Sequence, residues 1–314
     1  MKRSNRLTEG AMAAALYGIL LILALYVPVV SIVSVWFLPL PFIVYIIRNG
    51  TRSALPLWGC GMAIGLLFGS IWGLFFSLLF ASGGTVAGIL YRQKRPAFGI
   101  LLGGALTYTA GVILVYILTI VIWDLNLINQ TVETMRQAMR DSQSLLHTMG
   151  GGSQRNLEMF EQQLALYRYL APALLAFAGA TYALITQLAA TPVLRKIGLG
   201  DHVLPWKPFR EWQFPKSFLW YYLIILIIGF FHGFEAGSVG SIVYYNLLVV
   251  LQVVMFIQGL SFVFFYMHLR KWSKGLKGLT LILLVLLSVA TGMIFRLVGV
   301  IDLGFQMRDR LRSS

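Results

Sequence analysis

Long apolar stretches separated by short polar segments dominate the chain. The first runs from Ala11 to Val27 without a charged residue, and basic residues precede it at positions 2, 3 and 6. A helix of this length crosses the hydrocarbon core of a bilayer, and a basic flank favours the cytoplasmic side. The pattern predicts a membrane helix whose N-terminus lies in the cytoplasm.

Further apolar stretches follow before residue 190, and together with the first they predict a six-span domain over residues 1–190. They cover about 29–47, 54–69, 70–91, 97–123 and 167–190. Pro39 and Pro41 interrupt the second stretch, and because proline removes a backbone hydrogen bond we expect a broken or kinked helix there. The third and fourth stretches are rich in glycine, which predicts a hairpin with close helix contacts.

Residues 124–168 form the long polar part of this region. Apolar residues recur at helical spacing from position 128, and Gly150 to Gly152 end the pattern. The near balance of acidic and basic residues, without lysine, is typical of the outer face. We predict an extracellular helical hairpin with its tip at the glycines.

Residues 191–216 combine prolines, tryptophans and basic residues, a composition typical of a segment at the cytoplasmic headgroup level. We expect an interfacial elbow, followed by a C-terminal membrane domain of three to four spans over 217–314. Its last apolar stretch, 278–305, would be about 40 Å long as one helix, against a core of about 30 Å. A break near Thr291 and Gly292 would make two short spans and return the C-terminus to the cytoplasm, whereas a single span would leave it outside.

Composition supports an all-α polytopic membrane protein. The sequence is 58% hydrophobic and 11% charged, against about a quarter charged in soluble domains. The net charge of +14 is distributed in short clusters between apolar stretches, as cytoplasmic loops require, and every lysine falls on the predicted cytoplasmic side. No basic-aromatic module for nucleic acid is present. The partner that this composition implies is the lipid bilayer.

Catalytic and metal-binding motifs are missing from the sequence. It contains no nucleophile elbow, no phosphate-binding loop and no pair of acidic residues within one apolar stretch. Cys60 is the single cysteine, which excludes an intrachain disulfide and a cysteine-based metal site. His147, His232 and Glu235 lie near predicted outer loops, where exposure to water accounts for them. We therefore expect no enzyme, metal or cofactor.

Polar residues within the C-terminal spans have structural explanations. Asn246, Gln252 and Gln258 must find partners in an apolar setting, and bonds between helices would satisfy them. Arg296 is expected to pair with Asp302 or to extend its charge to the membrane surface.

Seven aromatic residues fall near the predicted outer ends of spans one to six: Trp36, Phe37, Trp72, Tyr116, Trp123, Tyr167 and Tyr169. One explanation is the aromatic belt that anchors membrane proteins at the interface. The other is a pocket that binds a planar or apolar small molecule near the outer face.

Ala11 and Ala15 are four residues apart and share a face of the first helix. Small residues allow close helix approach, either within the bundle or to a separate partner helix.

Two resemblances extend these expectations. The run Phe209-Arg210-Glu211-Trp212-Gln213-Phe214-Pro215-Lys216, with Asn246-Leu247 and Gln258-Gly259-Leu260-Ser261 further on, resembles the YybS-like family of uncharacterised bacterial membrane proteins. That resemblance covers essentially the whole chain and implies a bacterial cell membrane. Residues 1–190 are also similar to the substrate-binding S component of energy-coupling-factor transporters, in which an Ala-x-x-x-Ala pair contacts a membrane coupling partner.

The resulting hypothesis is an S-component-like transport protein that binds a small molecule near the outer face and a coupling partner at Ala11 and Ala15. The extra outer hairpin and about 120 further residues depart from that family's pattern. The alternative is a membrane scaffold or regulator that recruits proteins through the hairpin or the elbow.

Overall fold

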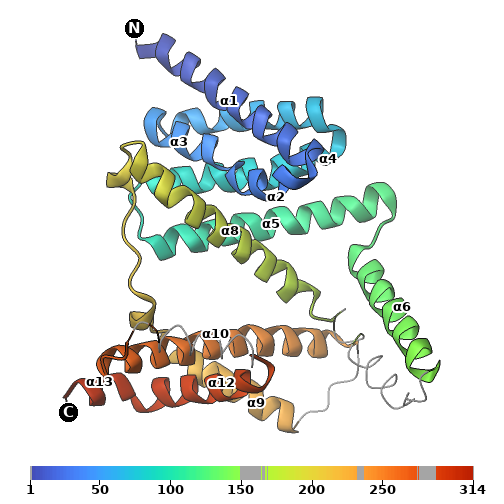
Figure 1. Cartoon of the computed structure of the whole chain (residues 1–314), viewed down its shortest axis with the longest axis vertical. Helices are drawn as coiled ribbons and strands as arrows, with labels where there is room; N and C mark the ends of the chain where they lie inside the picture. The colour runs from blue at the N-terminus through green and yellow to red at the C-terminus, as the bar shows by residue number, and fades with distance from the viewer. Residues whose placement is uncertain are drawn as a thin grey trace. The chain divides into compact units, whose positions relative to one another are not determined.

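The structure, a computed structural model, describes residues 2–148, 164, 167, 169–231, 237–273, 275 and 288–313. Every regular element within these residues is a helix, which confirms the predicted all-α fold (Figure 1). Six helical segments have the length and composition to cross a membrane. The chain forms two compact units: unit 1 holds Met1–Gly152 and Leu174–Trp206, and unit 2 holds Ser153–Ala173 and Lys207–Ser314.

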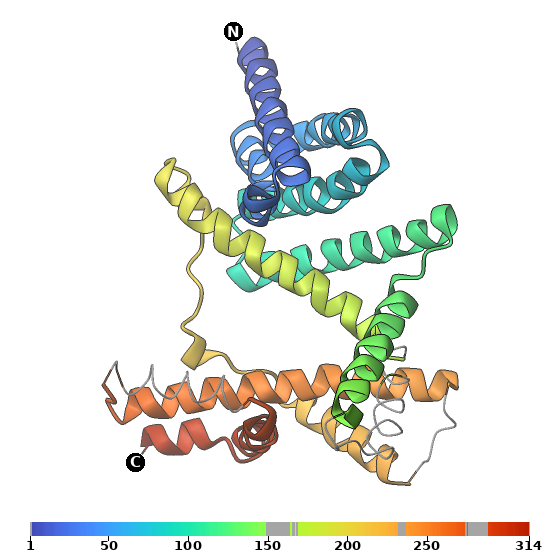
Figure 2. The same ribbon diagram turned by 45° about the vertical axis from the view of Figure 1, so that its right-hand side comes forward.

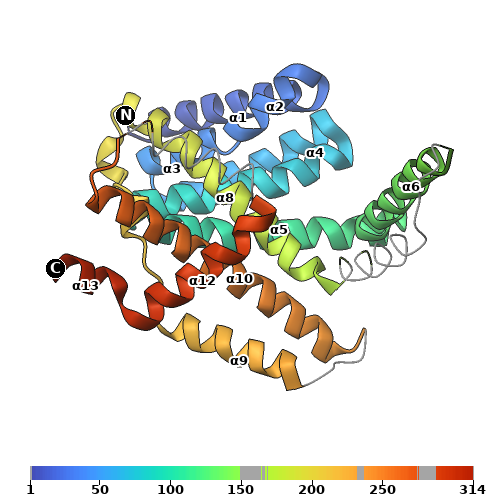
Figure 3. The same ribbon diagram turned by 60° about the horizontal axis from the view of Figure 1, so that its bottom comes forward.

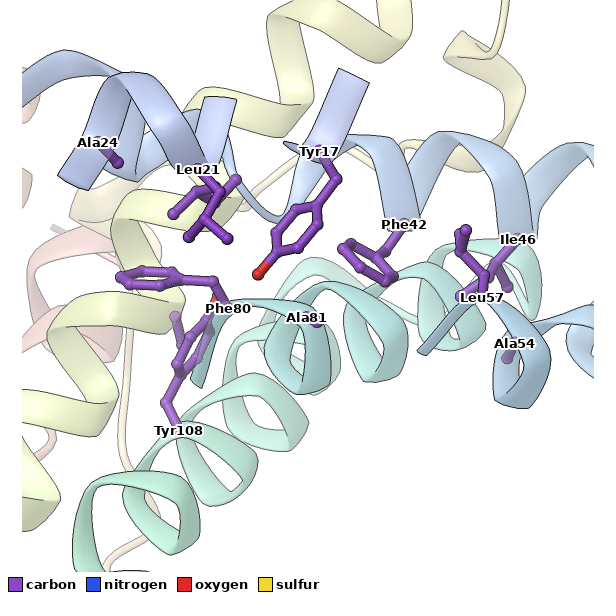
Figure 4. Packing of buried hydrophobic residues seen from close by; sticks show 12 residues of the cluster. Tyr17, Leu21, Ala24, Phe42, Ile46, Ala54, Leu57, Phe80, Ala81 and Tyr108 are labelled. Atoms are coloured by element: carbon purple, nitrogen blue, oxygen red, sulfur yellow. The ribbon is translucent and has the colours of Figure 1, made fainter. Parts of the chain in front are cut away.

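Helix α1 (Lys2–Tyr26) packs one face into the core of unit 1. Tyr17 and Leu21 on this face are fully buried. The Tyr17 ring lies 4.9 Å from that of Phe42 in an edge-on contact (Figure 4). Its hydroxyl lies 2.6 Å from Oγ of Ser77. The hydrogen bond satisfies a hydroxyl that burial has removed from water.

The second predicted stretch is broken where the prolines stand. Helix α2 (Pro28–Phe37) ends before Leu38, and α3 (Leu40–Asn49) begins after Pro39. Neither Pro39 nor Pro41 has an N–H to continue the hydrogen-bond ladder. Leu38 is fully buried, so this interruption lies within the protein, where irregular backbone at membrane depth is tolerated. The predicted break is confirmed.

The glycine-rich stretches form the predicted hairpin. Element α4 (Ala54–Arg92) follows the short turn η1 (Thr51–Ser53) and reverses at Ser70, whose φ is 52° and ψ is −143°. Across the hairpin, Trp58 Nε1 donates to Ser82 Oγ at 2.9 Å. A Cβ on Gly65 would lie 2.6 Å from the carbonyl oxygen of Gly73, so the two arms pack backbone to backbone.

Helices α5 (Ala97–Trp123) and α8 (Ala171–Lys196) complete the spans of unit 1. The Tyr108 hydroxyl lies 2.8 Å from Oγ1 of Thr186, which joins α5 to α8. Helix α8 continues six residues beyond the predicted limit at 190, with Pro192 inside it. The first residues of the predicted elbow are therefore helical, and buried Ala190 and Leu194 pack the helix on both sides of the proline.

Helix α6 (Leu127–Thr148) confirms the helical first arm of the predicted outer hairpin, and it follows α5 after a left-handed residue, Asp124 (Figure 2). Val132 is buried, whereas Met135 is 37% exposed. The predicted tip at 150–152 and most of the second arm lie outside the described residues.

The 3-10 turn η2 (Gly200–His202) follows α8 in unit 1. The part of the predicted elbow that belongs to unit 2 is residues 207–216, here called the elbow, and it contains the 3-10 turn η3 (Phe209–Glu211). Beyond it come α9 (Ser217–Phe231), α10 (Val239–Leu269), α12 (Ser288–Phe305) and α13 (Met307–Ser313), and α12 packs along α10 (Figure 3).

Helix α12 passes through Thr291 and Gly292 without interruption, so of the two alternatives the break at this point is not found. The Nε of Arg296 donates to the carbonyl oxygen of Gly292, within the helix, at 3.1 Å. Packing against α10 continues on both sides of Phe295, whose ring lies 5.8 Å from that of Phe256. Residues 276–287, which precede α12, lie outside the described part of the chain.

Candidate functional site

The seven aromatic candidates divide between the two units, since Tyr167 and Tyr169 belong to unit 2 and the others to unit 1. Trp72 stacks on Trp123 with ring centroids 5.0 Å apart and planes 8° apart. Trp36 instead contacts Tyr182, at 5.9 Å. The Trp72 and Trp123 side chains are 54% and 39% exposed. The stacked pair therefore presents an aromatic surface, and binding of a small molecule there stays a prediction.

Two other aromatic candidates have structural contacts. The Tyr116 hydroxyl donates to Oδ1 of Asn126 at 3.1 Å, and the same oxygen accepts the backbone N–H of Asn129 at 3.0 Å. This bond satisfies a free N–H at the start of α6, as an N-cap does. Phe37 packs against the buried cluster that contains Leu40. These contacts fix the ends of helices.

Ala11 and Ala15 both lie on the exposed face of α1. Met12 and Leu16 beside them are 68% and 50% exposed, whereas Tyr17 on the other face is fully buried. The packing of unit 1 therefore leaves the two alanines open to lipid or to a further helix.

The most developed polar arrangement in unit 2 was not predicted, and it centres on Asp302. Its Oδ2 accepts hydrogen bonds from Nε2 of Gln258 at 2.5 Å and from Nε of Arg308 at 2.9 Å. The Asp302 side chain is fully buried and that of Arg308 is 5% exposed. Removing both charges from water is costly, and the ion pair together with further hydrogen bonds offsets that cost.

The rest of the guanidinium group binds the elbow and α10. Arg308 Nη1 donates to the carbonyl oxygen of Arg210 at 2.9 Å, and Nη2 donates to Oγ of Ser261 at 3.1 Å. Its Cζ also lies 5.5 Å from the centre of the Phe265 ring, in cation–π range. One side chain of α13 thus connects α12, α10 and the elbow.

Two signature residues of α10 hold the elbow independently of Arg308. Oγ of Ser261 lies 2.7 Å from the carbonyl oxygens of both Phe209 and Trp212. Oε1 of Gln258 accepts the backbone N–H of Phe214 at 3.0 Å. The amide of Gln258 therefore accepts from the elbow and donates to Asp302. The elbow motif and the Gln-Gly-Leu-Ser motif, which are separate in the sequence, are therefore in direct contact in the structure.

The glycine of that motif permits the contact between α10 and α12. A Cβ on Gly259 would lie 1.9 Å from the carbonyl oxygen of Phe295, and a Cβ on Gly299 would lie 2.1 Å from that of Met255. Such distances exclude any side chain at either position while the helices stay in place. The backbones pack directly beside the buried ion pair, as small residues allow in membrane helices.

The structure corrects the predicted pairing of Arg296 with Asp302, because the partner of Asp302 is Arg308. The chain turns at Gln306, whose φ is 50°, and this turn folds α13 back. The sequence did contain a signal for the correct pair. Asp302 is the single acidic residue of its apolar stretch, and arginines follow it shortly afterwards. The left-handed residue, Gln306, is itself neither glycine nor proline, and the glycine near the turn is Gly304, two residues before it.

The expectation that buried amides bond between segments is confirmed for two residues. Gln258 bonds Asp302 and the elbow, as above. Asn246 Oδ1 accepts the N–H of Ala173 at 2.7 Å, and its Nδ2 donates to the carbonyl oxygen of Tyr169 at 2.5 Å. His232 and Glu235 lie outside the described residues, as does the side chain of His147.

Comparison with known proteins places these motifs in a family. The family described as "Predicted membrane protein (DUF2232)" matches residues 15–303. The chain is 31% identical to "Uncharacterized protein YybS" of Bacillus subtilis (strain 168), over 99% of this chain and 100% of that protein. No solved structure matches the chain. The protein, an all-helical membrane protein, therefore belongs to the DUF2232 family of predicted membrane proteins.

Proposed function

We propose that this protein is a non-enzymatic membrane transport protein, in which unit 1 binds a small planar or apolar molecule and α1 docks a membrane coupling partner. The observation that carries the proposal is the exposure of Ala11 and Ala15. A helix approaching this face would meet methyl groups, which allow the close backbone contact that membrane helices use for association. The resemblance to S components supplies the nature of the partner, a membrane protein driven by ATPases.

A leucine at position 15 tests the docking face. Ala15→Leu should block close approach of the partner and leave the fold intact, because a leucine facing lipid is favourable. Ala14→Leu is the matched control, since Ala14 packs against the buried cluster of unit 1. Oversized residues in a packed interface cost about 1–3 kcal/mol. We expect a lowered melting temperature for the Ala14 variant only.

The second measurement is co-purification from the native membrane, read by mass spectrometry. We expect an ATPase-coupled membrane protein to co-purify with the wild type and with an exposed-site control, Met12→Leu. It should not co-purify with Ala15→Leu. A lowered melting temperature for Ala15→Leu with unchanged co-purification would contradict docking at this face.

The small-molecule site is assigned to the stacked pair of Trp72 and Trp123. Two exposed, parallel indoles offer an apolar planar surface, and aromatic stacking favours planar ligands. Native mass spectrometry of the purified protein should show a retained small molecule that is lost in Trp123→Leu. If wild type and Trp123→Leu both retained the small molecule, the stacked pair would not be part of the binding site.

A scaffold is the second candidate, because α6 exposes apolar residues along with its charged ones. Leu127 is 42% exposed and Met135 is 37% exposed. A photo-crosslinking amino acid at Met135 should capture one defined protein in intact cells if α6 recruits a partner, and the same group at Arg140 provides the comparison. Capture of lipid alone at Met135 would favour transport over the scaffold.

A further inference from the structure

We propose that the elbow end of unit 2 binds the headgroups of acidic phospholipids. Basic residues from three separate segments reach this end: the elbow, the residues after α10, and α13. They are Lys207, Arg210, Lys216, Arg270, Lys271 and Arg310. The side chain of Arg210 is 39% exposed, and the other five residues are exposed.

The contacts within unit 2 explain why these residues share one end. Ser261 bonds the elbow, and the ring of Phe264 lies 5.7 Å from that of Phe209. Arg270 follows Phe264 by six residues, or about 9 Å along a helix. Arg308 bonds Ser261 from α13. The elbow, the end of α10 and α13 therefore meet (Figure 1).

Acidic side chains offset little of this positive charge. Asp302 is buried and bonded to Gln258 and Arg308. Glu211 lies 3.8 Å from Nε of Arg210 and is 44% exposed, so water screens that pair. The sequences of α9 and α10 contain no acidic residue, and that of α13 contains one, Asp309, between Arg308 and Arg310. The described residues at this end thus leave an excess of exposed cations, which favours an anionic ligand.

An exposed apolar surface on α9 begins next to the basic residues. It favours a lipid over a soluble anion as the ligand. Trp220 and Tyr221, one turn after Lys216, are 64% and 54% exposed. Ile224 and Phe230 further along α9 are 51% and 86% exposed. A ligand that matches both surfaces carries a negative headgroup and long apolar chains. Trp220 and Tyr221 lie between the basic residues and the apolar part of α9, and tryptophan and tyrosine are enriched at the headgroup level of membranes.

The inference goes beyond transport, since the site lies on unit 2 and does not involve α1 or the stacked tryptophans. It agrees with the positive-inside distribution, which predicts that this end faces the cytoplasm, where juxtamembrane basic residues attract anionic lipids.

Native mass spectrometry of the full chain in detergent tests the proposal, with phosphatidylglycerol and phosphatidylcholine as probes. Wild type should retain phosphatidylglycerol in preference to phosphatidylcholine. Lys207→Gln combined with Lys216→Gln should weaken that binding roughly thirtyfold, about 2 kcal/mol, since each basic residue near an anionic surface contributes about 1 kcal/mol. Phosphatidylcholine binding should not change.

The matched control removes two positive charges elsewhere, with Arg136→Gln and Arg140→Gln in α6. It should leave phosphatidylglycerol binding unchanged. Melting temperatures of both double variants should lie close to that of wild type. Both lysines and Arg140 are exposed, and the pair of Arg136 with Glu133 is a surface ion pair, which contributes little. Equal binding of the two lipids by wild type, equal loss in both double variants, or displacement of lipid by inorganic phosphate would each overturn the proposal.

Discussion

Arg308 and Asp302 form a buried ion pair across a reversal of the chain, with Nε 2.9 Å from Oδ2. Gln306, between them, has a left-handed backbone conformation with φ of 50°. The pair is therefore not an i,i+4 contact along one helix surface. It holds the short helix α13 against α12 and, through Ser261, against α10.

Loss of this arginine should destabilise unit 2 strongly. Arg308→Ala leaves a buried carboxylate without its cation, and breaking a buried pair costs about 3–5 kcal/mol. Thermal unfolding of the purified protein in detergent measures the effect. Arg310→Ala, two residues on and exposed, should change the melting temperature little.

A double substitution separates burial of charge from loss of packing. Asp302→Leu with Arg308→Met removes both charges and keeps apolar volume, so it should recover much of the stability lost in Arg308→Ala. A double variant no more stable than Arg308→Ala would show that the hydrogen bonds of Arg308 to the Arg210 carbonyl and to Ser261, rather than the unpaired charge, account for the loss.

The contact of α10 with α12 predicts strong sensitivity at Gly259. Gly259→Ala would place a methyl group on the Phe295 carbonyl and force the helices apart, at a cost of about 1–3 kcal/mol. Gly292→Ala in α12 is the comparison, because a Cβ there meets no atom within 4 Å. Differential scanning calorimetry should show the first variant destabilised and the second unchanged or slightly stabilised, as alanine favours helix more than glycine does. Equal melting temperatures would contradict the close packing.

Asn246 predicts a local effect at the start of α8. Its amide satisfies the free N–H of Ala173 and the carbonyl of Tyr169, and such bonds within membranes contribute about 1 kcal/mol. Asn246→Leu should raise amide hydrogen exchange near Ala173 and leave exchange in α12 unchanged. Gln252→Leu, on the same helix, should not accelerate exchange at Ala173. Uniform acceleration across unit 2 would instead indicate global loosening.

The distribution of lysine predicts the topology. In a chain carrying Cys60→Ala, a cysteine at Ser142 should react with an impermeant maleimide in intact cells, and one at Ser273 should not. Both serines are exposed on the structure, so access within the protein is comparable. Equal labelling would contradict the assigned sides.

Sequence patterns predicted the elements of this fold well wherever local chemistry determines them. Hydropathy and length located the spans, Pro39 located the break between α2 and α3, and the glycines located the α4 hairpin. Proline was a poorer guide in α8, because packing of Ala190 and Leu194 carries the helix past Pro192. The break considered near Gly292 is also missing, since α12 runs through this residue as continuous helix.

The candidate sites were less predictable, because they depend on which distant segments meet. The motifs at 209–216 and 258–261 were visible in the sequence, but nothing in their spacing showed that Gln258 and Ser261 bond the elbow. Asp302 was recognised as polar in an apolar stretch. Arg296 was considered as its partner because nothing in the sequence showed that the turn at Gln306 brings Arg308 back to it. The exposure of Ala11 and Ala15 required the packing of the opposite face of α1.

The bond from Arg308 to the carbonyl of Arg210 joins residues 98 positions apart. During synthesis the elbow therefore emerges long before the arginine that secures it, and at an elongation rate of about 5–20 residues per second that interval lasts roughly 5–20 s. Until then the elbow can be held by residues of α10, among them Ser261, Gln258 and Phe264. The contacts of Arg308 therefore complete unit 2 only when α13 has been synthesised, so they belong to the last step in its assembly.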